Sequence, residues 1–122
     1  MLGTILAIAG VATQIFGWFM DFKWTKEGNK IGIKEKNWLF RGKGGNLDVK
    51  KAIFLGFGIE YGVAIGAYFL ANGFQTAEQG PTGWHAFGCT LISFGVFHYI
   101  YSLKSKKAIR YRKANPNVEW YQ

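Results

Sequence analysis

The chain has 122 residues, one cysteine and a formal net charge of +8, and its mean hydropathy is close to zero. A single domain is the expectation for this length, and the lone Cys89 excludes an intrachain disulfide framework. No CxxC, haem-attachment or His-rich pattern occurs, so we expect no cofactor and no metal site.

Apolar residues are concentrated in three runs of about 20 residues, the length that crosses roughly 30 Å of hydrocarbon. The first run has no ionisable side chain, the second has only Glu60, and the third has only His85 and His98. The first run lacks the basic n-region and small-residue exit of a signal peptide, so we expect it to be retained. The sequence therefore predicts an all-α integral membrane protein whose residues 1–122 form one membrane domain, with transmembrane helices at about 1–20, 52–72 and 84–103.

The distribution of Lys and Arg predicts the orientation of these helices. Nine of the fifteen lie between Asp21 and Lys51, the other six lie between Leu103 and Gln122, and the rest of the chain has none. By the positive-inside rule the N-terminus is outside and the C-terminus is cytoplasmic, across a plasma (cytoplasmic or inner) membrane. Because anionic headgroups explain the positive charge, the lipid bilayer is an expected partner and nucleic acid is not. The predicted connections are a cytoplasmic loop at 21–51, an outer loop at 73–83 and a cytoplasmic tail at 104–122.

The cytoplasmic loop is longer than orientation alone requires. Phe22, Trp24, Ile31 and Ile33 alternate with polar residues around Glu27–Gly28–Asn29, which is a weak signal of a short β-hairpin. The loop and the tail are also rich in side chains suited to a headgroup layer or to another subunit. The residues expected to dock on lipid headgroups or on a partner are Lys34, Lys36, Trp38, Arg41, Lys104, Lys106, Lys107, Arg110 and Arg112.

The ends of the predicted spans carry capping and interfacial signals. Asn46 is the predicted N-cap of a helix that starts at Leu47, and Asp48 falls in its first turn. Aromatic residues at both ends of the spans are expected at the headgroup level. These aromatic residues are Trp18, Phe19 and Trp84.

Small residues recur at helical spacing in all three spans, and they let another helix backbone approach closely. The second span has two opposed small faces, one with Gly58, Gly62 and Gly66 and the other with Gly56 and Glu60. Two such faces predict protein contacts on two sides and a central position for this helix. The predicted packing glycines, a glycine-zipper pattern, are Gly3, Gly10, Gly17, Gly58, Gly62, Gly66, Gly88 and Gly95.

Three polar side chains are predicted to meet inside the membrane. At 1.5 Å per residue, Gln14, Glu60 and His98 lie about 10, 13 and 9 Å from the basic ends of their helices. A charge at that depth costs about 3 kcal/mol, so Glu60 is either protonated or paired with His98 and hydrogen-bonded to Gln14. Such a layer is an interhelical clamp, a proton or cation relay carried by Glu60, or a ligand or metal contact shared with a larger assembly.

No catalytic constellation is visible, because the serines lack a nucleophile context and Gly42–Lys43–Gly44–Gly45 lacks the Walker spacing. We therefore expect no enzyme, but a small accessory or structural subunit of a larger membrane complex that contacts other membrane-protein subunits. The alternative is a homo-oligomeric pore or proton- or cation-conducting protein that uses the Glu60 layer; its topology alone resembles that of class I phage holins. A third interpretation is a regulator whose basic tail, ending in Val118–Glu119–Trp120–Tyr121, docks a soluble partner.

Overall fold

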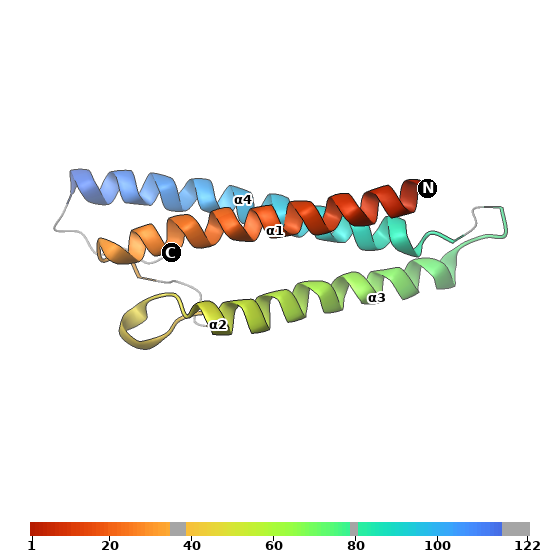
Figure 1. Cartoon of the computed structure of the whole chain (residues 1–122), viewed down its shortest axis with the longest axis horizontal. Coiled ribbons are helices and arrows are strands. Elements are labelled where there is room, and N and C mark those ends of the chain that lie inside the picture. Colours follow the sequence, from red (N-terminus) through yellow and green to blue (C-terminus); the bar gives the residue numbers. More distant parts are fainter. Residues whose placement is uncertain (35–38, 79–80, 116–122) are drawn as a thin grey trace.

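The computed structural model describes residues 1–34, 39–78 and 81–115, and it consists of three long helical rods (Figure 1). The first rod is α1, Leu2–Lys30, and the third is α4, Gly83–Ala114. The second rod combines α2, Val49–Ala52, a π-helical turn at Ile53–Phe57, and α3, Gly58–Phe74. Along these rods α1 and α4 run side by side in the same direction, whereas α3 runs the opposite way.

All three rods are long and apolar enough to cross a membrane, as the sequence predicts. Their most apolar windows are also poorly covered by the rest of the chain, since only 28%, 17% and 22% of the residues in these windows are buried. In water this exposed apolar belt would strongly favour aggregation, whereas hydrocarbon solvates it without cost. The all-α class and three-helix architecture are therefore confirmed, and no strand occurs among the described residues.

The α1–α4 pair is the tightest interface, and glycines make it so. A Cβ at Gly10 would lie 2.6 Å from the carbonyl oxygen of Gly88, and a Cβ at Gly17 would overlap the carbonyl oxygen of Gly95. The two backbones therefore touch directly along the first half of each helix. On α1 these glycines recur every seven residues, with Gly3 against Trp84, which is the interval that keeps contacts in line as two helices coil around each other.

The buried face of α4 continues this seven-residue pattern well beyond the apolar run. Its buried residues after the first turn alternate three and four positions apart, which is the spacing of a two-helix seam. These residues are Gly88, Leu91, Gly95, His98, Ser102, Ser105 and Ile109. The seam explains why α4 stays helical to Ala114 instead of ending near Leu103.

The β-hairpin expected in the first connection is wrong. Residues 22–30 are the last turns of α1, and Thr25 and Gly28 are buried within them. Packing of these turns along the continuing α4 seam outweighs the weak alternation of apolar and polar residues, because helices in proteins are stabilised mainly by tertiary burial. The helix α1 therefore ends at Lys30, and the connection to the second rod begins at Ile31.

The folded-back connection, described at residues 31–34 and 39–48, lies against the basic end of α1. The Asn29 amide donates to the carbonyl oxygen of Ile33 at 2.8 Å and its oxygen accepts from the Leu47 amide at 2.8 Å. Arg41 and Leu47 form an isolated antiparallel bridge, and the turn between them uses Gly44 and Gly45 at positive φ. Ile33 is fully buried, so this segment is packed against the bundle rather than spread along a surface.

The second rod starts at a different cap from the one expected. Asp48, not Asn46, is the N-cap, and its carboxylate accepts a hydrogen bond from the Lys51 amide at 3.1 Å. Asn46 instead accepts, through its carbonyl oxygen, from the Gly42 amide in the preceding turn. Beyond the cap, Ala52, Gly56, Glu60 and Ala64 are all buried, four residues apart. A π turn takes more residues than an α turn, so it keeps these positions on one face of the rod.

Candidate functional site: a buried polar cluster

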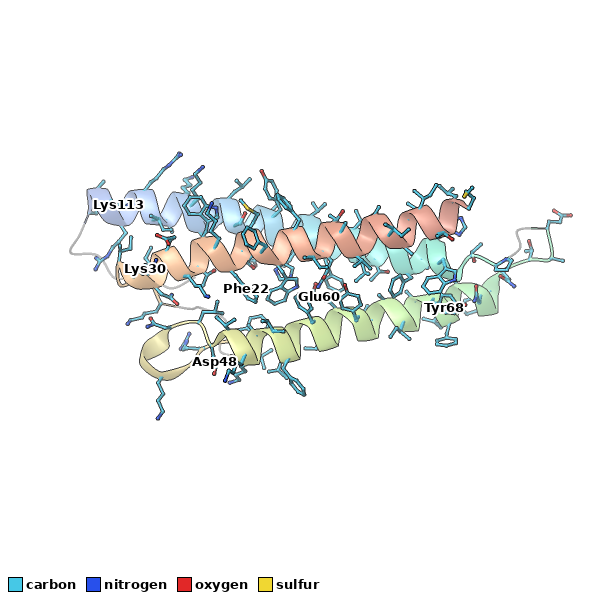
Figure 2. The ribbon with its side chains drawn as sticks, viewed as in Figure 1. Phe22, Lys30, Asp48, Glu60, Tyr68 and Lys113 are labelled. Atoms are coloured by element: carbon cyan, nitrogen blue, oxygen red, sulfur yellow. The ribbon has the colours of Figure 1, made fainter. Side chains whose placement is uncertain are left out.

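A cluster of polar side chains lies between the three rods, and Glu60 is at its centre (Figure 2). One carboxylate oxygen, Oε2, accepts hydrogen bonds from the Trp18 indole at 2.9 Å and from His98 Nε2 at 2.7 Å. The other, Oε1, accepts a longer bond from the Gln14 amide at 3.5 Å. Nitrogen atoms of three side chains therefore surround the Glu60 carboxyl group.

His98 connects Glu60 to a second carboxylate. Its Nδ1 lies 2.9 Å from Oδ2 of Asp21, while its Nε2 lies on Glu60. Each ring nitrogen therefore has one carboxyl oxygen as its hydrogen-bond partner, and the His98 ring bridges Glu60 and Asp21. Asp21 is held in turn by the Thr25 hydroxyl at 3.4 Å. The result is a carboxylate–imidazole–carboxylate chain that starts at the basic end of the bundle and ends at Glu60.

Aromatic rings enclose this chain. The Trp18 ring lies against the His98 ring with 4.1 Å between centroids, and Trp18 is only 2% exposed. Phe22, Phe40 and Phe57 surround Trp18 at centroid distances of 4.8, 5.8 and 5.3 Å. Phe40 comes from the folded-back connection, so that segment contributes directly to the enclosure. Low local polarity of this kind strengthens each charged hydrogen bond.

Local sequence explains how each side chain reaches the cluster. Gln14, Trp18 and Asp21 are four and three residues apart, so they lie on one side of α1. On the second rod, Gly56 leaves the space that the Trp18 ring occupies, since a Cβ there would overlap the ring. Tyr61, next to Glu60, donates its hydroxyl to Gln14 Oε1 at 3.1 Å and so orients the Gln14 amide toward Glu60.

The structure brings Gln14, Glu60 and His98 together, and it adds three residues that the sequence reasoning missed. Trp18 was expected at the headgroup level, but its ring is buried and its N–H is used by Glu60. Asp21 was treated only as the start of the cytoplasmic loop, and Tyr61 was not among the predicted site residues. The sequence did contain a signal for Trp18 and Asp21, because they follow Gln14 at intervals of four and three residues and so lie on the same side of the helix.

The predicted packing glycines separate into two groups. Those on α1 and α4 form the close contact already described, whereas Gly58, Gly62 and Gly66 lie on the exposed face of α3, opposite Glu60. Apart from the adjoining backbone of the same helix, no atom of the described residues lies within 4 Å of where a Cβ would stand on any of these three. The second rod is therefore not central within one chain.

The predicted docking residues have several environments. Lys104, Lys107 and Arg110 are exposed on α4, while Lys34 and Arg41 are half-buried in the folded-back connection. Arg112 Nε donates to the carbonyl oxygen of Ile31 at 3.2 Å, so it ties α4 to that connection. Lys106 packs over the Trp24 ring. Lys36 and Trp38, together with the tail sequence Val118–Tyr121, lie outside the described residues.

Among the described residues, no group of three or more His, Cys, Asp and Glu side chains is arranged to hold a metal ion. The two carboxylates of the cluster bind opposite nitrogens of His98 and do not converge on one point. Comparisons with protein-family models, with curated proteins and with solved structures find no match for this chain.

Proposed function

We propose that this protein is a small non-catalytic subunit of a larger membrane complex, and that the exposed glycine face of α3 contacts a transmembrane helix of another subunit. One observation carries the proposal: Gly58, Gly62 and Gly66 have open space where every buried glycine of the α1–α4 seam has a neighbour. Glycine weakens a helix by up to about 1 kcal/mol relative to alanine, so three glycines that faced only lipid would destabilise α3 with no compensating contact. Close packing against the backbone of another transmembrane helix would provide that contact.

The buried cluster supports this role as a clamp. Glu60 and Gly58 are two residues apart and so face opposite sides of the helix. When Glu60 is bonded to α1 and α4, the rotation of α3 is fixed and the glycine face is held outward. The clamp therefore pre-orients the surface that we propose for assembly.

In this proposal the basic end lies on the cytoplasmic side and the N-terminus lies outside, in the plasma membrane. The basic ends of α1 and α4, the folded-back connection and the tail then face cytoplasmic headgroups and partner subunits. Single cysteines that replace Glu78 and Lys113, in a Cys89→Ala background, would test this orientation with a membrane-impermeant maleimide on intact cells. Labelling at position 78 but not at position 113 is expected, and the reverse would contradict the orientation.

Purification in a mild detergent tests the assembly. The chain should co-purify with a foreign membrane subunit at fixed stoichiometry, and Gly62→Leu should remove that subunit. Ala12→Leu is the matched control, because it makes a similar small-to-large change at an exposed position of α1. If Gly62→Leu and Ala12→Leu retain the same partners, the glycine face is not the assembly surface.

A pore lined by the Glu60 layer is the alternative, and the geometry favours it less. Glu60 is 5% exposed and its donors come from the same chain, so the layer does not face a path between copies. Conductance in liposomes that is lost in Glu60→Gln would nevertheless establish this alternative. Absence of conductance in the wild-type chain would dismiss it.

A further inference from the structure

Two lysines from different helices converge on one tryptophan at the basic end of the bundle. Lys23 Nζ on α1 and Lys106 Nζ on α4 each lie 5.2 Å from the centroid of the Trp24 ring. Each contact is a cation–π interaction, which holds the two ammonium groups near the same ring. The arrangement crosses the α1–α4 seam, so it exists only because the two helices stay paired beyond the apolar runs.

Neither lysine has a carboxylate of the described residues within ion-pair distance, and only Glu27, four residues after Lys23, attracts one of them. The described carboxylates of this end are Asp21, Glu27 and Asp48. Asp21 is bonded to His98, Glu27 to Lys30 at 2.9 Å, and Asp48 caps the second rod. Glu27 is therefore shared between Lys30 and Lys23, so the two ammonium groups near the Trp24 ring keep most of their charge available for an anion from outside the described residues.

The depth of the site matches the phosphate level of a lipid. Trp24 lies four residues beyond Met20, where the first apolar run ends, which is about 6 Å along the helix axis. A headgroup layer is about 5–7 Å thick on each side of the hydrocarbon. The two ammonium groups consequently lie at the level of lipid phosphates.

An apolar surface leads from this site toward the middle of the membrane. Phe16 and Tyr99 stack across the same α1–α4 seam, with centroids 6.1 Å apart, and both rings are about half-exposed. Phe16 lies seven residues before Lys23 and Tyr99 seven residues before Lys106, so each ring falls on the same side of its helix as the lysine. Leu103, 48% exposed, lies one turn before Lys106 on the same side. A phosphate at the lysines would therefore place an acyl chain along these rings.

We propose that Lys23, Trp24 and Lys106 bind the phosphate of an anionic phospholipid, whose acyl chain lies over Phe16 and Tyr99. The lysines supply charge-assisted hydrogen bonds and Trp24 fixes their positions. The apolar strip distinguishes this occupant from a soluble anion, which would gain nothing from Phe16 or Tyr99.

The test uses the full chain in detergent micelles and counts bound lipid by native mass spectrometry. Dioleoylphosphatidylglycerol is the probe, with dioleoylphosphatidylcholine and inorganic phosphate as comparators. Lys23→Gln with Lys106→Gln should weaken phosphatidylglycerol binding by at least about tenfold, since charged hydrogen bonds of this kind are worth roughly tenfold each. The matched control, Lys26→Gln with Lys107→Gln, removes the same charge from exposed positions of the same helices and should weaken it by no more than about threefold, because such charges are screened.

A third variant distinguishes a defined binding site from non-specific electrostatic attraction. Trp24→Ala removes no charge, yet it should weaken phosphatidylglycerol binding by about fivefold because the lysines lose their common anchor. Equal losses in the two lysine pairs, or full binding in Trp24→Ala, would overturn the proposal. So would equal binding of phosphatidylcholine, or displacement of the lipid by millimolar phosphate, which would indicate a soluble anion instead.

Discussion

Replacement of Glu60 by leucine removes the acceptor at the centre of the buried cluster. Two short hydrogen bonds are lost, from Trp18 Nε1 at 2.9 Å and from His98 Nε2 at 2.7 Å, together with the longer bond from Gln14. In a water-soluble protein, the loss of one partner of such a buried ion pair would cost about 3–5 kcal/mol. In a membrane the separated helices find other polar partners, and each interhelical bond is worth only about 0.6–1.7 kcal/mol.

The membrane value applies here because helices of this length stay inserted when they separate. Two short bonds then predict that Glu60→Leu lowers the free energy of unfolding by about 1–3 kcal/mol. Glu60→Gln should cost less, since an amide oxygen in the place of Oε2 can still accept from both Trp18 Nε1 and His98 Nε2.

Titration of the purified chain with sodium dodecyl sulfate in mixed micelles measures this difference, with tryptophan fluorescence as the signal. The order of stability should be wild type, then Glu60→Gln, then Glu60→Leu. Ile59→Leu is the control, because Ile59 is 53% exposed next to Glu60 and its replacement should leave the midpoint unchanged. If Glu60→Leu unfolds at the same detergent fraction as Ile59→Leu, the cluster contributes nothing to holding α3.

Three further predictions concern other parts of the fold. Gly10→Ala should lower stability in the same titration by about 1–3 kcal/mol, because its Cβ would lie 2.6 Å from the Gly88 carbonyl oxygen. Gly62→Ala, whose Cβ would stand in open space, should not lower it. Equal midpoints for the two variants would contradict the close contact between α1 and α4. Asn29→Ala should speed trypsin cleavage after Lys43, because the connection loses both hydrogen bonds of the Asn29 side chain, and an unchanged rate would mean that the other contacts hold it. Asp48→Ala should cost about 1 kcal/mol locally, visible as faster amide exchange in α2 and not in α4, and unaltered exchange would show that the cap is dispensable.

The sequence predicted the elements that depend on hydrocarbon thickness. Run length and the absence of charge specify three membrane helices, and a polar residue on a small-residue stripe can only face another helix. Gln14, Glu60 and His98 could therefore be selected before the structure was known. The contact partners of these residues depend on rotation and on relative height, and Trp18 illustrates the difficulty. An indole at the end of a span suits a headgroup layer and a buried carboxylate equally well, and only the space above Gly56 decides between them.

The β-hairpin predicted in the first connection was wrong for a different reason. Residues 22–30 have no strong helical pattern of their own, because their buried face consists of small and polar residues such as Thr25 and Gly28. What keeps them helical is α4, which continues alongside with Ser102, Ser105 and Ile109 buried. Tertiary burial of this kind is not visible in one segment read alone. The basic residues of 21–30 thus lie on a helix that extends the bundle, which also creates the Trp24 site.

The opposite faces of α3 link folding to the proposed assembly. Glu60 holds the helix to its own chain, and Gly62, two residues on, points to the other side. Loss of Glu60 removes the constraint on rotation, so Glu60→Leu should weaken both folding and partner retention. Gly62→Leu leaves every bond of the cluster in place and should weaken partner retention only. If Gly62→Leu also lowered the stability of the isolated chain, the glycine face would be packed within the monomer, and the separation of the two faces would be wrong.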